Sequence, residues 1–203
     1  MHARLFAILL ITSPLVAAAA DQAAATILSY HHVGQPTYKT IPRRGAPDVA
    51  SEELRYALTR EAFTAELDHL EQQGYHVIPL SDLVGYVKGQ RDSLPPRSVV
   101  ITVDDGWLSS YCEIFPELKR RRMPFTLFIY PEIIGRSAAY LTWPEVVEMA
   151  NDGVDVESHS FTHPSLTLRA NATMRSASYP QFLEHELLDS KREIERRSVP
   201  KAT

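Results

Sequence analysis

A short apolar run that stops at two adjacent carboxylates constrains the fold of this chain most. Residues Val99–Gly106 read VVITVDDG. A β-branched run of this kind is typical of a buried parallel strand, and the glycine ends it. In parallel α/β folds, reactive groups collect at the carboxyl ends of the strands, because the loops there converge on one face. Asp104 and Asp105 are therefore expected at the functional face of a parallel sheet.

Residues Ser158–Leu166 repeat this arrangement with imidazoles in place of carboxylates. They follow another strand-like run, Gly153–Glu157, and contain His159 and His163. Pro164 and the loop-like SFT segment favour a turn between the two histidines over a helix. Two carboxylates and two imidazoles at the same end of a sheet form a candidate metal site. Two histidines and one carboxylate leave coordination positions open for water and substrate, and they suit Zn²⁺ or another divalent transition metal.

The two aspartates cannot bind one ion symmetrically while both belong to the strand, because successive side chains of a strand point to opposite faces. A natural division is that one carboxylate binds the metal and the other remains free as a general base. Neither motif is specific by itself, since Asp-Asp-Gly is usually a turn and H-x-x-x-H is often two surface histidines. Their joint occurrence at strand ends of one domain favours the metal site.

Strand and helix patterns alternate along the rest of the chain. This alternation predicts an α/β fold with parallel strands and right-handed crossovers, either a sheet or a barrel. Further strands are predicted at Thr26–Tyr30, Tyr75–Leu80 and Pro124–Tyr130. Helices are predicted at Arg60–Gln73, at Trp107–Arg122 and at Tyr179–Arg197. Two more helices are predicted, one from Ser81 to about Gly89 and one that begins with a capping box at Thr142.

The final predicted helix carries Leu183, Leu187 and Ile194 along one face. A crossover helix normally returns the chain to a further strand. No strand pattern follows this helix, so the sequence predicts a domain whose C-terminal strands are missing.

Composition narrows the class of protein. The chain has 203 residues, enough for one domain with a substantial core, and a formal net charge of −4. Without a basic surplus, neither nucleic acid nor anionic lipid is expected as a partner. Cys112 is the single cysteine, which excludes an intramolecular disulfide and a cysteine-based zinc framework. We expect it to be a buried, inert thiol in the helix after the Asp-Asp-Gly turn.

The N-terminus has the layout of a secretory signal. Arg4 precedes a short apolar run, Leu5–Ile11, and small residues, Ala17–Ala20, come before Asp21. This arrangement predicts a cleaved signal peptide over residues 1–20 and a mature domain over residues 21–203. The protein is then exported to the periplasm or beyond and meets the membrane only transiently, with an uncleaved anchor as the alternative.

Both motifs also match a known family, in content and in order. Thr102–Gly106, TVDDG, resembles the T-F-D-D-G motif of polysaccharide deacetylases, the NodB-homology group. Ser158–His163, SHSFTH, resembles their H-[ST]-x-x-H motif. Ile27–His31, ILSYH, is similar to the strand that begins many members, including exported poly-N-acetylglucosamine and chitin-type deacetylases. The resemblance runs from about Thr26 to the end of the chain.

The resemblance implies a distorted (β/α) barrel and a metal-dependent deacetylase acting on an N-acetylated polysaccharide of the N-acetylglucosamine type. It implies that Asp105, His159 and His163 bind the metal, most simply Zn²⁺, and that Asp104 is the general base. In such chemistry the metal polarises the acetyl carbonyl and acidifies the attacking water, whose proton Asp104 would take.

The chain departs from the family pattern in two respects. Val103 replaces the usual phenylalanine, which is a change of packing. The later motifs are absent; in the family they supply an arginine and an aspartate that orient the base, and a histidine that protonates the leaving amine. His31 and Tyr130, each at the end of a predicted strand, are candidate substrate contacts, with structural roles as the alternative.

Two other classes of function compete with a deacetylase. One is a catalytically incompetent module that binds glycan or metal, which the missing C-terminal motifs make plausible. The other is a non-haem Fe(II) oxygenase, which also uses two histidines and a carboxylate, although those ligands normally lie in a β-sandwich. The sequence leaves open the glycan, the metal and the oligomeric state.

Overall fold

The computed structural model describes residues 25–34, 57–167 and 178–197. The predicted signal peptide, residues 1–20, lies outside these ranges and remains a prediction. Among the described residues, no helix has both the length and the apolar character needed to cross a membrane.

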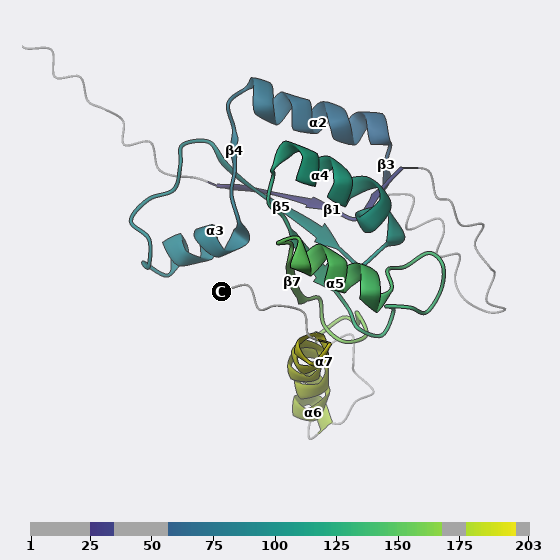
Figure 1. The fold of residues 1–203 in the computed structure, drawn as a ribbon. Coiled ribbons are helices and arrows are strands. Elements are labelled where there is room, and N and C mark those ends of the chain that lie inside the picture. Colours follow the sequence, from purple (N-terminus) through teal and green to yellow (C-terminus); the bar gives the residue numbers. More distant parts are fainter. Residues whose placement is uncertain (1–24, 35–56, 168–177, 198–203) are drawn as a thin grey trace, which may run out of the picture.

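A parallel β-sheet organises the protein, as the sequence predicted (Figure 1). Its main path runs β1-β5-β6-β7, and a short fifth strand, β4, pairs with the beginning of β5. Every strand pair in it is parallel. The strands are β1 (Thr26–Tyr30), β4 (His76–Val77), β5 (Ser98–Asp104), β6 (Thr126–Ile129) and β7 (Asp155–Ser158). A separate parallel pair joins β2 (His32–Val33) to β3 (Ala57–Leu58).

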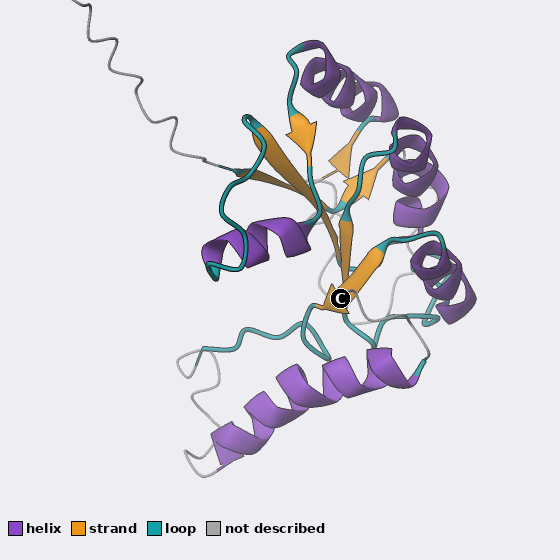
Figure 2. Ribbon diagram, turned by 60° about the vertical axis from the view of Figure 1, so that its left-hand side comes forward, coloured by secondary structure: helices purple, strands orange, loops and turns teal. Residues whose placement is uncertain are grey.

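Helices lie on both sides of this sheet (Figure 2). Three of them, α2 (Arg60–Gln72), α4 (Phe115–Arg121) and α5 (Trp143–Asn151), share the main hydrophobic core with the strands. The helix α3 (Leu80–Val87) packs on a smaller cluster around Val100. β5 is buried along its length until Asp104, which explains why four of the five residues from Val99 to Val103 are apolar.

Local sequence signals fix two of the helix starts. The hydroxyl of Thr59 accepts a hydrogen bond from the Ala62 amide at 3.1 Å and caps α2. The predicted capping box of α5 is confirmed, since the Thr142 amide donates to Glu145 Oε2 at 2.7 Å. The helix predicted from Ser81 begins one residue earlier, at Leu80, and Pro79 is its N-cap.

Two predicted helices contain π-helical turns that their sequence patterns did not indicate. In the first, η2 (Ser110–Ile114) precedes α4, and the wider turn accommodates Pro116, which has no amide hydrogen to donate. This segment also exposes Cys112, so its predicted burial is wrong. Partial burial nevertheless raises the pKa of the Cys112 thiol, which agrees with an inert group.

The C-terminal helix is continuous but consists of three pieces. They are α6 (Tyr179–Leu183), the π-helical η4 (Glu184–Asp189) and α7 (Ser190–Arg196). The π turn shifts the buried face, so that Leu187 is 47% exposed whereas Glu186 is only 2% exposed. The predicted apolar face through Leu187 is therefore wrong, and Glu186, Ser190 and Ile194 form the buried face instead.

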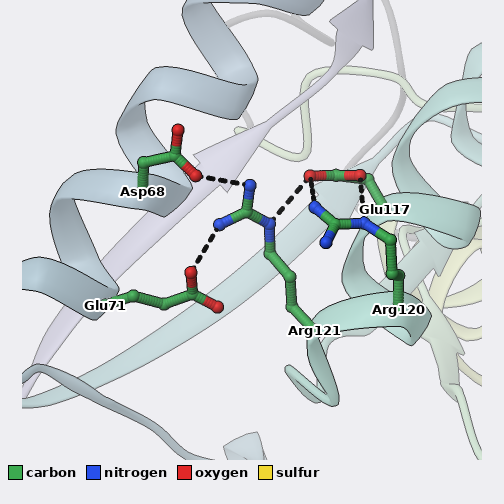
Figure 3. Close-up of polar contacts among 5 residues, drawn as sticks. All are labelled: Asp68, Glu71, Glu117, Arg120 and Arg121. Carbon is green, nitrogen blue, oxygen red and sulfur yellow. Dashed lines mark hydrogen bonds and ion pairs between the residues drawn. The ribbon is translucent and has the colours of Figure 1, made fainter.

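A buried arginine joins α2 to α4 (Figure 3). The Arg121 side chain is 4% exposed and contacts three carboxylates, those of Asp68 at 2.6 Å, Glu71 at 2.8 Å and Glu117 at 2.7 Å. Arg120 also donates to Glu117, at 2.6 Å. Since each of the three guanidinium nitrogens contacts a carboxylate, the network fixes how the two helices pack over the sheet.

Lowering the pH is expected to remove the stabilisation that Glu117 contributes. Hydrogen bonds from Arg120 and then Arg121 lower the pKa of Glu117 from 4.5 to about 2. Because the folded-state pKa is the lower one, this contribution is complete above pH 4.5 and disappears as the pH falls towards 2. In urea titrations, the difference in free energy of unfolding between wild type and Glu117→Gln should shrink on acidification. A difference independent of pH would contradict this assignment.

Candidate metal centre

The carboxyl ends of the strands bring the predicted site residues to one edge of the sheet. Asp104 is the last residue of β5 and pairs with Phe128 of β6, and Ile129 pairs with Ser158 of β7. Asp105 follows with a φ of +76°, in the left-handed region. The strand has therefore ended before Asp105. The side chains of Asp104 and Asp105 are then not bound by the rule that successive strand residues point to opposite faces, and they take separate positions.

The turn after β5 requires glycine at position 106. Gly106 has a φ of +75° and follows Asp105 in the same left-handed region. A Cβ atom there would lie 2.9 Å from Ile134 Cδ1 and 3.3 Å from Ile129 Cγ2. Its carbonyl accepts a hydrogen bond from the Leu141 amide at 2.9 Å. Both backbone conformation and close packing thus hold the turn that carries Asp105.

Replacing Gly106 with alanine is expected to destabilise the fold by about 1–3 kcal/mol, because the new Cβ adds left-handed strain and must displace Ile134. Thermal or urea unfolding measures the loss. Gly135→Ala is the matched control, since Gly135 also has a positive φ, +78°. Apart from its chain neighbours, no atom of the described part of the chain lies within 4 Å of its added Cβ. Equal losses in the two variants would show that the packing against Ile134 contributes nothing.

Asp105, His159 and His163 form a compact cluster of metal-ligating atoms. Asp105 Oδ1 lies 3.6 Å from His159 Nε2 and 3.6 Å from His163 Nε2. All three ligand atoms lie within 4.8 Å of one another. The segment between the histidines is a turn, as Pro164 indicated, and it brings both imidazoles to the same carboxylate.

The donor set fits a divalent transition metal. Two atoms bound tetrahedrally to Zn²⁺ at about 2.0–2.1 Å lie about 3.4 Å apart, close to the 3.6 Å observed here. Asp105 Oδ1 is buried and has no hydrogen-bond partner among the described residues. An orphaned carboxylate oxygen facing two imidazole nitrogens is costly unless a cation satisfies it.

The electrostatics of the cluster favour the metal-binding form of His159. Burial lowers the pKa of the His159 imidazole, His163 and His31 lower it further, and the carboxylates of Asp104 and Asp105 oppose these effects. The net shift is downward. Since metals bind the neutral imidazole, the shift keeps this ligand competent at lower pH.

Asp104 is held separately from the cluster. Its Oδ2 accepts a hydrogen bond from the Ser29 hydroxyl of β1 at 2.7 Å. Its Oδ1 is buried and has no hydrogen-bond partner among the described residues. One oxygen is thus fixed by the neighbouring strand while the other remains available to a proton donor. The Asp104 carboxylate also acts electrostatically on His159, whose pKa it raises.

The two candidate substrate contacts lie at the same edge. His31 follows β1, whose last residue, Tyr30, pairs with Val103, and it acts electrostatically on His159. The Tyr130 ring stacks on His163 with centroids 5.1 Å apart and an interplanar angle of 18°. The Tyr130 ring therefore borders the cluster, and His31 lies at the same edge of the sheet. Their contact with substrate remains a prediction.

Sequence reasoning missed three residues that contact this site. Ser29 bonds to Asp104, and Glu186 and Ser190 of the C-terminal helix bond to the segment between the histidines. Serine in a strand carries no distinctive signal. Glu186 was not singled out because a glutamate in an amphipathic helix is expected to face solvent. Its burial becomes evident only from the π turn in the structure.

Comparison with known proteins finds relatives among the deacetylases. The chain is 26% identical over 166 residues to the YxkH protein of Bacillus subtilis, whose name places it among the polysaccharide deacetylases; the match covers 82% of this chain and 50% of YxkH. It is 28% identical over 116 residues to the poly-β-1,6-N-acetyl-D-glucosamine N-deacetylase of Staphylococcus epidermidis, covering 54% of this chain and 39% of that enzyme. The chain thus spans about half the length of YxkH, and less of the staphylococcal enzyme.

Solved structures share the fold. The structure of IcaB from Ammonifex degensii superimposes with a TM-score of 0.68 at 24% identity, covering 87% of this chain and 70% of that one. The deacetylase PplD of Streptococcus pyogenes gives a TM-score of 0.65 at 20% identity, covering 85% of this chain and 68% of that one. At these identities the likeness concerns the fold, and it confirms the predicted deacetylase-type α/β architecture.

The sequence profile of the polysaccharide deacetylases matches residues 91–203, more than half of the chain. The matched region contains the Asp-Asp-Gly turn after β5 and both clustered histidines. The predicted resemblance is therefore confirmed, and the chain belongs to the polysaccharide deacetylase family.

Proposed function

We propose that this protein is a metal-dependent hydrolase that removes acetyl groups from an N-acetylated polysaccharide. One observation carries the proposal. The ligand atoms of Asp105, His159 and His163 converge on a point at the carboxyl edge of the sheet. The adjacent Asp104 carboxylate has one oxygen that no described residue hydrogen-bonds. A hydrolytic site needs this combination of a cation-binding cluster and a separate proton acceptor.

A divalent metal bound by the three side chains would polarise the acetyl carbonyl and lower the pKa of the attacking water. We propose Zn²⁺ as this metal because two of the three side chains are imidazoles. The chain itself supplies the rest. The Ser29 hydroxyl fixes Asp104 Oδ2, so that Oδ1 is the atom proposed to take the proton of the attacking water. Backbone and side-chain geometry thus separate metal binding from proton transfer, although the two aspartates are adjacent in sequence.

An N-acetylglucosamine-type glycan is the proposed substrate. The named substrate of the staphylococcal relative, poly-β-1,6-N-acetyl-D-glucosamine, supports this class. Tyr130 stacks on His163, and an aromatic ring beside a metal cluster suits a sugar ring, so we assign Tyr130 and His31 as substrate contacts. Export through the segment 1–20 would bring the protein to such a polymer. The parallel α/β sheet argues against the alternative of an Fe(II) oxygenase.

Acetate release from a soluble N-acetylglucosamine oligomer tests the proposal. The chain is assayed after treatment with a chelator, with and without added Zn²⁺, and the reaction is followed by enzymatic determination of acetate. Release that requires the metal is expected. Stoichiometric metal binding without release would instead identify a metal-binding module, and the absence of both would contradict the proposal.

A further inference from the structure

The segment that carries the two histidines has a strained backbone. Ser160 has a φ of +67° and His163 a φ of +57°. Left-handed conformations of residues other than glycine cost on the order of 1 kcal/mol or more each, and they persist only where the surrounding structure holds them. The contacts that hold this segment therefore decide where the two imidazoles lie.

A buried glutamate of the C-terminal helix supplies the central contacts. The amides of Phe161 and Thr162 both donate to Glu186 Oε2, each at 2.9 Å. The Thr162 hydroxyl donates to Glu186 Oε1 at 2.8 Å. Both carboxylate oxygens thus bind the segment midway between His159 and His163.

Ser190, one helical turn further along, adds a second contact. Its hydroxyl donates to the Ser160 carbonyl at 2.7 Å and lies 2.7 Å from the Ser158 hydroxyl, at the end of β7. The His159 amide in turn donates to the Ile129 carbonyl of β6 at 2.8 Å. The segment is therefore fixed to the sheet at one end and to the helix in its middle.

The helix buries this glutamate where an amphipathic helix would normally bury an apolar side chain. Glu186 is 2% exposed, whereas its neighbours Leu187 and Leu188 are about half exposed. Burying a carboxylate while two leucines remain in water costs free energy. The three hydrogen bonds that Glu186 accepts offset this cost. The π turn of η4 produces this arrangement.

Building on the proposed metal-dependent function, we infer that Glu186 is a positioning residue for the metal centre. It bonds to the two central amides of the His159–His163 segment and so sets the spacing of the two imidazoles about Asp105. It does not touch the metal or the substrate. Ser190 supports the same segment from the next turn.

Zn²⁺ affinity of the full chain, measured by isothermal titration after chelator treatment, tests this inference. Glu186→Ala removes the acceptor of both amides, and an affinity about 10–100-fold weaker is expected, as for other residues that orient metal ligands. With Co²⁺ as the probe, the visible absorption bands should change, since they report ligand geometry. Thermal unfolding of the metal-free form shows whether the variant is folded.

Two conservative variants separate positioning from a general loss of stability. Thr162→Val deletes only the bond from the hydroxyl to Oε1, so it should weaken Zn²⁺ binding a few-fold. The metal-free form should still unfold cooperatively, at a slightly lower temperature because one oxygen of the buried Glu186 carboxylate loses its donor. Glu186→Gln should retain most of the affinity, because its amide oxygen accepts both backbone amides and its amide nitrogen can donate to Thr162 Oγ1. Glu184→Ala, at an exposed position of the same helix, should bind as wild type.

The outcomes distinguish this inference from the proposed function. If wild type binds Zn²⁺ and releases acetate while Glu186→Ala and Thr162→Val bind Zn²⁺ equally well, the positioning role is wrong and the proposed function remains. A folded Glu186→Ala with altered Co²⁺ bands supports the role. Wild type that binds no metal overturns both.

Discussion

Replacing Asp104 with asparagine is expected to lower kcat for acetate release by about 10²–10⁴-fold, the usual contribution of general acid–base catalysis. Asparagine has the same shape and can still accept the hydrogen bond that Ser29 donates to Oδ2 at 2.7 Å. It cannot take a proton from water. The loss should therefore appear in kcat, with KM and the Zn²⁺ affinity little changed.

A matched control for this variant is Asp155→Asn. Asp155 is a half-buried carboxylate of β7 that also has one buried oxygen without a hydrogen-bond partner among the described residues. Burial raises the pKa of Asp155, so a neutral amide should be tolerated there and activity should be retained. If Asp104→Asn instead lost Zn²⁺ binding, Asp104 would be a metal ligand and the roles of the two aspartates would have to be exchanged.

The second large effect is expected from His159→Ala, which removes one of the three clustered ligands. The free energy of Zn²⁺ binding to structural sites with four ligands is about 10–16 kcal/mol, or roughly 3 kcal/mol for each ligand. The variant is therefore expected to bind Zn²⁺ about 10²-fold more weakly, or weaker still. Acetate release at a fixed metal concentration should fall with it. Isothermal titration and the acetate assay measure the two quantities separately.

His76→Ala is the control for this variant. His76 is exposed and lies in β4, where it pairs with Ser98 at the opposite end of β5 from the cluster. Its replacement should leave both metal affinity and activity unchanged. Full Zn²⁺ affinity in His159→Ala would mean that the cluster of Asp105, His159 and His163 is not the metal site.

Much of the architecture could be predicted because it is encoded locally. The strand predicted at Thr26–Tyr30 is β1, with the same bounds. The apolar run before Asp104 is the buried strand β5, and the capping box at Thr142 begins α5. Each depends on short-range periodicity or on a contact within one turn of the chain, which a sequence displays directly.

The candidate site was only partly predictable. Placing Asp105, His159 and His163 at the carboxyl edge of one sheet needed only the alternation of strands and helices. The hydrogen bond from Ser29 to Asp104 depends on the pairing of β1 with β5, which joins residues 75 positions apart. No local pattern encodes such a partner.

The sequence by itself determined the alternating strands and helices, the parallel sheet and the residues at its carboxyl edge, because strand and helix periodicities are local properties. The tertiary structure decided which helix faces are buried. It exposed Cys112 and Leu187, and it buried Glu186 against the turn between the histidines. The physical reason is that a π turn rotates the register of a helix by an amount that only packing against the sheet selects.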